Sequence, residues 1–238
     1  MGKNGIKKLG KRDGAKDSME YKDEGYLPEA MINYLALLGW HPSDDKELFT
    51  MSELIKTFEA ERIQKAGAQW NDDKLNWINK EHIKKLQGAE LENYIFGWLP
   101  KELQIKRIIP IIVERISKFG DIKTMVDNGE LDFFYKKPEY KKEKLIYKNT
   151  NPEMILFNLE KVVDKLNEID EKNFNKDEIK KCLNAISTEV GKSGEVLHPV
   201  RFALSGLDKS PDPFILAEIL GKSETIARLN TAIKLLKL

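Results

Sequence analysis

Five cationic side chains and two glycines lie within ten residues near the start of the chain. The cations are Lys7, Lys8, Lys11, Arg12 and Lys16, and the glycines are Gly10 and Gly14. Glycine lets backbone N–H groups approach a phosphate closely, and ammonium groups neutralise its charge. The segment is therefore suited to binding phosphates, although composition alone favours a solvated basic tail, which is common at chain ends.

Cysteine and histidine offer little further chemistry. Cys182 is the only cysteine, so an intrachain disulfide is impossible, and its spacing from Ile179 and Ile186 predicts a core position on one helix face. His41, His82 and His198 are too scattered for the paired spacing of a zinc site. We therefore expect no metal site, and a reducing, cytoplasmic compartment.

The composition is that of an ordinary soluble globular protein, with 41% hydrophobic and 33% charged residues among 238. A net charge of only +1 means that any surface for nucleic acid must come from an uneven distribution of charge. No signal peptide is visible, and the longest apolar stretches are too short to span a membrane. We expect no membrane partner.

Lysines recur between residues 136 and 148, with Tyr140 and Tyr147 interleaved and Glu139 and Glu143 diluting the charge. Such a run could lie along an RNA backbone. A solvated helix face is the interpretation that the sequence favours.

Hydrophobic periodicity near 3.6 recurs throughout the chain, whereas period-2 alternation is nearly absent. The pattern predicts an all-α fold of irregular helical bundles with roughly ten or more helices. Ser52 is a candidate N-cap, and Pro110 predicts a kink inside a helix over 101–121. The other predicted helices span 28–39, 51–63, 71–86, 88–99, 151–169, 174–191, 196–206, 213–221 and 222–236.

Four motifs, in this order, resemble the bacterial-type glutamyl-tRNA synthetases, which are class I aminoacyl-tRNA synthetases. KLGKRDGA (8–15) resembles their KMSKS-type loop, and GYLPEA (25–30) with the NYL and LGW that follow resembles the next helix. KLNWIN (74–79) resembles their stem-contact region. PVRFALSG (199–206) and EILGK (218–222) resemble their anticodon-binding region.

The resemblance implies three parts: a KMSKS-type loop ending the catalytic domain (1–20), a helical stem-contact domain (21–97) and an α-helical anticodon-binding domain (98–238). The last is expected to divide again near 136–150. The nucleotide-binding fold and its HIGH motif precede the loop in that family, and no such motif occurs in this sequence. We therefore expect the chain alone to be inactive and to bind no cofactor.

Within that family, the loop acts on ATP. The resemblance implies that Lys11, supported by Lys8, stabilises the charge that develops during adenylate formation, and that Lys11 and Arg12 bind ATP. ATP would act with Mg²⁺ in the intact enzyme. Gly10 departs from the family's usual serine, so a hydroxyl that could bond to phosphate is absent and the loop gains flexibility.

The resemblance places anticodon-reading residues in two regions. The first holds Arg115 and Lys118, where lysine lacks the bidentate fork of the arginine that some members carry. The second holds Arg201 and a loop that could offer flat faces for unpaired bases. The alternative is that the prolines shape a turn and the aromatic ring belongs to the core. The loop residues are Ser210, Pro211, Pro213 and Phe214.

Trp77 and His82 lie in the stem-contact stretch. A half-buried tryptophan more often packs than contacts RNA. His82 could meet a phosphate or be a surface residue without a role.

The resemblance implies a tRNA-binding portion of a glutamate–tRNA ligase, monomeric, with tRNA(Glu), glutamate and ATP as partners. Whether tRNA(Gln) is also a partner stays open. The alternative is a stand-alone helical RNA-binding or interaction module without catalysis. The intact Lys-x-x-Lys-Arg loop argues mildly against the alternative, because such a module would not need it.

Overall fold

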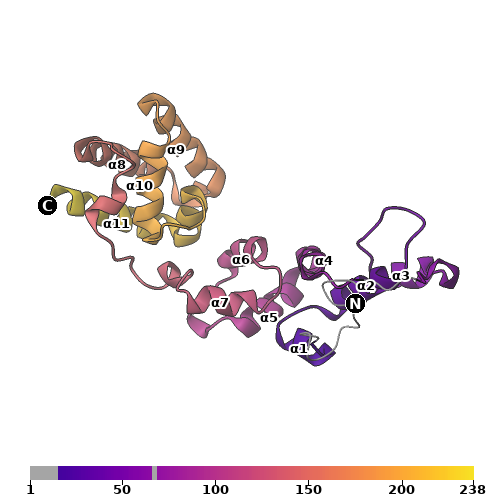
Figure 1. Cartoon of the computed structure of the whole chain (residues 1–238). Helices are drawn as coiled ribbons and strands as arrows, with labels where there is room; N and C mark the ends of the chain where they lie inside the picture. The colour runs from indigo at the N-terminus through magenta and orange to yellow at the C-terminus, as the bar shows by residue number, and fades with distance from the viewer. Residues whose placement is uncertain (1–15, 66–68) are drawn as a thin grey trace. The chain divides into compact units, whose positions relative to one another are not determined.

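The computed structural model describes residues 16–65 and 69–238 of the chain. Over these residues the chain is helical, and its only β pairing is an isolated bridge between Trp40 and Ile63 (Figure 1). The prediction of an all-α fold is confirmed. The chain divides into two compact units, residues 1–127 and 128–238, which are described separately.

The first unit begins with short helices whose starts are set by side-chain caps. Asp17 and Glu20 form a capping box at α1, and Thr50 and Glu53 form another at α3, so Thr50 takes the role expected of Ser52. Pro28 occupies the first turn of α2, where its missing N–H costs nothing. The elements are α1 (Ser18–Asp23), α2 (Pro28–Gly39), α3 (Met51–Thr57) and a 3₁₀ turn, η2 (Ala60–Arg62).

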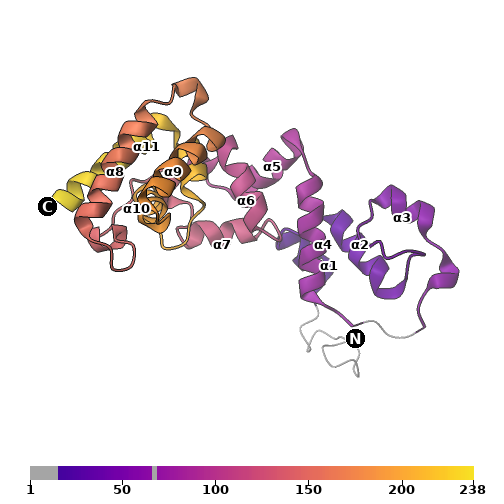
Figure 2. The same cartoon turned by 90° about the horizontal axis from the view of Figure 1, so that it is seen from above.

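Helix α4 (Asp72–Lys85) packs against α2 (Figure 2). Asn71 caps its N-terminus through an amide oxygen that accepts the N–H of Lys74. Leu75, Ile78 and Ile83 are fully buried, as the 3.6 periodicity predicts. Helix α5 (Gly88–Trp98) follows after a two-residue break.

The predicted kink at Pro110 is wrong. Residues 101–108 form two 3₁₀ turns, η3 (Lys101–Leu103) and η4 (Lys106–Ile108). Helix α6 (Ile109–Arg115) follows, with Pro110 in its first turn. Proline is tolerated in the first turn of a helix because the N–H it lacks has no partner there. A second short helix, α7 (Asp121–Asp127), ends the unit.

Four helices form the second unit around one hydrophobic core, and they lie side by side in both views (Figures 1 and 2). Asn151 and Asn175 cap α8 and α9, while Gly191 and Gly206 end α9 and α10 in the left-handed conformation that glycine favours. The helices are α8 (Pro152–Asn167), α9 (Lys176–Val190), α10 (Gly194–Ser205) and α11 (Pro213–Lys237). At Gly221 the backbone of α11 leaves the helical region, so the segment consists of the two predicted helices in sequence.

The stretch 136–148 is not a helix face, contrary to the sequence interpretation. It runs as extended chain with one short 3₁₀ turn, η6 (Lys142–Leu145), after η5 (Asp132–Phe134). Leu145 is fully buried in the core of the unit, and Pro138 interrupts any helix before it. Another 3₁₀ turn, η7 (Glu171–Asn173), joins α8 to α9. No helix among the described residues is long and apolar enough to cross a membrane.

The expected boundary at residues 97 and 98 lies within the first unit. The division into loop, stem-contact and anticodon-binding domains therefore stays a prediction.

Candidate nucleic-acid interface

The candidate ATP-binding residues Lys8, Lys11 and Arg12 lie outside the described residues. The segment that follows them is built around Glu24, at the end of α1. Its carboxylate accepts hydrogen bonds from the ammonium groups of both Lys16 and Lys118. Burial alone would raise the pKa of Glu24, but these two hydrogen bonds outweigh it and hold the pKa below its ordinary value.

The side chain of Lys118 is therefore engaged by other residues of the first unit. Its ammonium group also lies 5.0 Å from the ring centroid of Tyr26, at cation–π distance. The backbone around it is fixed, because the carboxylate of Asp121 accepts the N–H groups of Ser117 and Lys118 at 2.7 and 3.1 Å. A base-reading role for Lys118 stays a prediction, and it would require exchanging Glu24 for RNA.

Two backbone hydrogen bonds join the same two segments. The N–H of Phe119 donates to the carbonyl of Gly25 at 3.0 Å, and the N–H of Gly120 donates to the carbonyl of Glu24 at 3.1 Å. Gly25 has φ +85°, and a Cβ built on it would lie 2.6 Å from the Gly120 nitrogen. Only glycine allows this approach.

The buried amide of Asn79 completes the junction. Its oxygen accepts the N–H of Leu27 at 2.9 Å, and its nitrogen donates to the carbonyl of Ser117 at 2.6 Å. Sequence reasoning placed this asparagine in a family stretch without assigning it a role. A polar residue on the apolar face of a helix was the available signal.

The two stem-contact candidates on α4 have different environments. Trp77 is 42% exposed, so its ring is open to a ligand. His82 is only 7% exposed and shares a 3.1 Å hydrogen bond between its Nε2 and Oδ1 of Asn33. Burial, followed by the charge of Lys85, lowers the pKa of His82. The expectation of a surface histidine is wrong, because the 3.6 periodicity turns residue 82 toward the same core as Ile78.

Arg115 is exposed at the C-terminal end of α6. The second candidate group for anticodon reading belongs to the other unit and is centred on α10. Arg201 directs one guanidinium nitrogen to the carbonyl of Asp208 at 3.1 Å and to the hydroxyl of Ser210 at 3.0 Å. The hydroxyl of Ser205 also donates to Ser210 at 3.1 Å. Arg201 thereby fixes the loop that joins α10 to α11.

Phe214 belongs to the core, which settles the alternative that the sequence left open for it. Its side chain is 9% exposed and packs in the same cluster as Leu216 and Ala217. Pro213 is buried in the first turn of α11, whereas Pro211 is partly exposed in the loop. A flat face for a base can thus come from Pro211 but not from the ring of Phe214.

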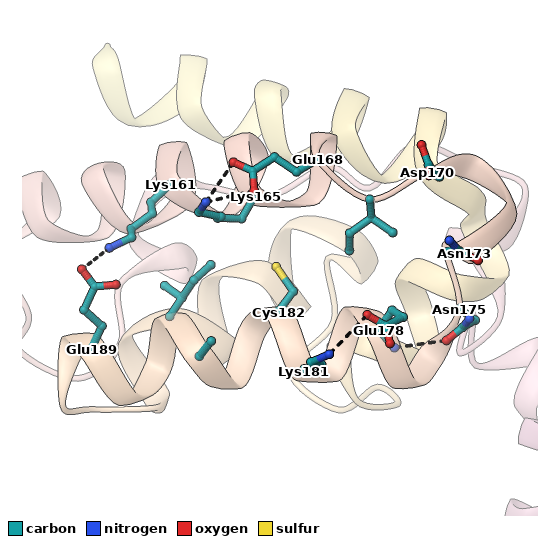
Figure 3. Close-up of a pocket in the computed structure, with 13 residues that line it drawn as sticks. Lys161, Lys165, Glu168, Asp170, Asn173, Asn175, Glu178, Lys181, Cys182 and Glu189 are labelled. Atoms are coloured by element: carbon teal, nitrogen blue, oxygen red, sulfur yellow. Dashed lines mark hydrogen bonds and ion pairs between the residues drawn. The ribbon is translucent and has the colours of Figure 1, made fainter.

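A groove of about 770 Å³ lies between α8 and α9 (Figure 3). Each of its lysines pairs with a carboxylate: Lys161 with Glu189, Lys165 with Glu168 and Lys181 with Glu178. Cys182 lies partly buried on its wall, and burial raises the pKa of the thiol. Because its lysines are paired and its thiol is protonated, this groove has no evident chemistry.

Among the described residues no cluster of three or more His, Cys, Asp or Glu side chains could hold a metal ion.

Sequence comparison gives the class of protein. Residues 81–233 match the family model of the anticodon binding domain, and residues 3–77 match that of the class I tRNA synthetase (E and Q) catalytic domain. The chain belongs to the anticodon-binding-domain family. The resemblance to glutamyl-tRNA synthetases is confirmed.

Curated relatives sharpen this assignment. The chain is 38% identical over 246 residues to the glutamate–tRNA ligase of Clostridium kluyveri, with 99% of this chain and 49% of that protein covered. It is 38% identical over 238 residues to that of Clostridium botulinum strain Eklund 17B, with 97% and 48% covered. The chain thus spans about half the length of the curated relatives it matches.

Solved structures agree with this. The glutamate tRNA ligase of Elizabethkingia meningosepticum, in complex with its amino acid, matches with a TM-score of 0.74 and 32% identity, over 97% of this chain and 49% of that one. The glutamate-tRNA synthetase of Elizabethkingia anophelis matches with a TM-score of 0.71 and 31% identity, over 96% and 48%.

Proposed function

We propose that this chain is the tRNA-binding portion of a glutamate–tRNA ligase. The anticodon-binding family match over residues 81–233 is the observation that carries the proposal. The relatives that match nearly all of this chain are named glutamate–tRNA ligases. Arg201, on α10, holds the loop between α10 and α11 that is a candidate for reading the anticodon. The proposed partner is tRNA(Glu), bound by a monomer in the cytoplasm.

The whole enzyme would act in two steps. The glutamate carboxylate attacks the α-phosphorus of ATP, and pyrophosphate leaves to give glutamyl-adenylate. A ribose hydroxyl of the tRNA 3′ end then attacks the activated carbonyl, and AMP leaves. In the first step Lys11, with Lys8 and Arg12, would stabilise the phosphate charge, and Mg²⁺ would accompany ATP. Glutamate and ATP are thus proposed partners of the whole enzyme.

Tertiary contacts suggest how the ATP-facing segment is positioned. Lys16 lies five residues after Lys11, and its ion pair with Glu24 attaches the end of that segment to the junction with residues 117–120. The first unit would therefore hold the base of the loop while the lysines beyond it reach ATP.

The decisive experiment is binding of the chain to a labelled tRNA(Glu) transcript at stated salt. The competitors are the same transcript with a swapped anticodon and an unrelated tRNA, and a tRNA(Gln) transcript defines the breadth of recognition. We expect tight binding that weakens at least tenfold on the anticodon swap. Equal affinity for all competitors would contradict an anticodon-reading role.

A further inference from the structure

We propose that residues 136–148, the lysine arm, bind the phosphate backbone of the RNA stem that leads into the anticodon loop. The proposal rests on the tRNA-binding function proposed above and adds a phosphate path to it. The arm contains six lysines and two glutamates, for a net charge of +4. The whole chain carries +1, so all other residues together carry −3. The arm is thus one of two basic stretches in the chain, the other being residues 7–16.

The arm runs antiparallel along the whole of α10. Near one end Pro138 contacts Gly206, where an added Cβ would lie 2.8 Å from the proline Cβ. One turn earlier on α10, the ring of Phe202 meets that of Tyr140 edge to face at 5.6 Å. At the other end the ring of Tyr147 covers Gly194 so closely that no Cβ fits. Twelve residues of helix give a path of about 18 Å, long enough for several phosphates of one strand.

Side-chain contacts hold the arm in place. The imidazole Nε2 of His198 lies 3.0 Å from the carbonyl of Lys144, and both oxygens of Asp208 accept from the Lys144 ammonium at 2.9 Å. Arg228, itself buried, donates to the carbonyls of Phe133 and Leu204 at 2.8 and 2.6 Å, which fixes the chain just before the arm. A preorganised cationic surface loses less entropy on binding than a flexible tail.

Four lysines of the arm are exposed and form no ion pair with any described acid: Lys137, Lys141, Lys142 and Lys148. Lys148 is fixed in the left-handed region at φ 52°, the only non-glycine residue among those described with positive φ. Its turn is held by Thr150, whose hydroxyl contacts the carbonyl of Tyr147 at 2.7 Å and the buried Glu195 at 3.2 Å. The backbone of Lys148 is therefore held in place, and its exposed ammonium group lies 5.2 Å from the ring centroid of Tyr147.

The contrast with the groove between α8 and α9 supports a ligand for the arm. In that groove Lys161, Lys165 and Lys181 all pair with glutamates of the same unit. In the arm the unpaired cations lie along one helix, and this helix carries Arg201 near its C-terminal end. His198 and Arg201 are three residues apart and share the face of α10 that the arm and the loop after α10 cover. A backbone path and a base-reading loop would thus share α10.

The test compares two triple variants that remove the same charge. The arm variant is Lys141→Gln/Lys142→Gln/Lys148→Asn, with asparagine chosen because it tolerates the left-handed conformation. The control is Lys165→Gln/Lys172→Gln/Lys181→Gln, on α8, η7 and α9. Binding to labelled tRNA(Glu) and to its anticodon-swapped form is measured across a salt series, after circular dichroism has shown that both variants fold.

We expect the arm variant to bind tRNA(Glu) at least tenfold more weakly at 0.1 M salt, with the salt slope reduced by about 2 to 3. The ratio between correct and swapped anticodon should be unchanged, because phosphate contacts carry no sequence information. The control variant should change the affinity less than twofold. The charge-keeping variant Lys141→Arg/Lys142→Arg should bind tRNA(Glu) as tightly as the unmodified chain.

If the arm variant binds tRNA(Glu) no more weakly than the control variant does, the lysine arm is not a phosphate site. The same conclusion follows if the arm variant no longer distinguishes the correct from the swapped anticodon. If the unmodified chain discriminates anticodons while the arm variant matches the control, only this inference fails. If the unmodified chain binds all RNAs equally and the arm variant binds them more weakly, only the proposed function fails. No RNA binding at all would overturn both.

Discussion

The ammonium group of Lys118 pairs with the carboxylate of Glu24, which lies 94 residues earlier in the chain. The pair ties the segment that follows the candidate ATP-binding loop to a residue expected to read the anticodon. Both side chains are about three-quarters buried, so the pair is better shielded than an ordinary surface salt bridge.

Glu24→Gln should lower the stability of the first unit by about 1 kcal/mol near neutral pH, since it leaves Lys16 and Lys118 without their common partner. The folded pKa of Glu24 lies below its ordinary value of 4.5, so its contribution is full above that pH and is lost as the pH falls through the folded pKa. Urea unfolding at pH 7 and at pH 3 measures this. An equal loss at both pH values would contradict the ion pair.

Gly25→Ala should destabilise the first unit by more than about 2 kcal/mol, because a Cβ would lie 2.6 Å from the Gly120 nitrogen and φ is +85°. Gly97→Ala is the matched control: Gly97 lies in the last turn of α5 with no atom within 4 Å of an added Cβ. Alanine there should raise stability by roughly 0.5–1 kcal/mol. Thermal unfolding of both variants checks the sign, and a neutral Gly25→Ala would refute the close packing.

Phe214→Ala should cost about 3–4 kcal/mol in the second unit, as for other large core truncations, whereas Phe214→Leu should cost far less. Phe214→Leu should also keep its affinity for tRNA(Glu) within about twofold, because the ring is buried. Urea unfolding and tRNA binding are both measured. Full stability with lost binding would show that the ring stacks on a base.

Arg201→Lys should keep the charge but lose the guanidinium nitrogen that donates to both Asp208 and Ser210. We expect affinity for tRNA(Glu) to fall about tenfold and discrimination against the swapped anticodon to fall with it, in line with roughly 1–3 kcal/mol for a specific contact. Ser210→Ala should give a smaller loss in the same direction. A uniform loss across all RNAs would instead assign Arg201 to phosphate.

His82 should titrate below its ordinary pKa of 6.5, since burial and then Lys85 disfavour the charged imidazole. The unfolded chain binds the proton more readily, so the contribution of His82 to stability is present above that pH and is lost as the pH falls below it. NMR titration of the imidazole measures the shift. A pKa at or above 6.5 would indicate an exposed ring or an acidic partner.

Local sequence was sufficient for much of the fold. Helical periodicity, asparagine caps at 71, 151 and 175, and the glycine stop at Gly191 act over a few residues, so they identify the helices of both units. The motifs also indicated the family. Four short matches in the family's order are unlikely to arise by chance, although any one of them alone would be weak evidence.

Other features depended on contacts between distant residues. Sequence distance hides that Glu24 meets Lys118, that Asn79 bridges Leu27 and Ser117, and that residues 136–148 lie along α10 rather than forming a helix of their own. Whether His82 and Phe214 face RNA or the core was decided by tertiary packing as well. The sequence by itself determined most of the longer helices and the family, because both depend on local patterns. Only the tertiary structure decided which polar side chains are used up in holding the fold and which remain for a ligand, because partners far apart in the chain satisfy them.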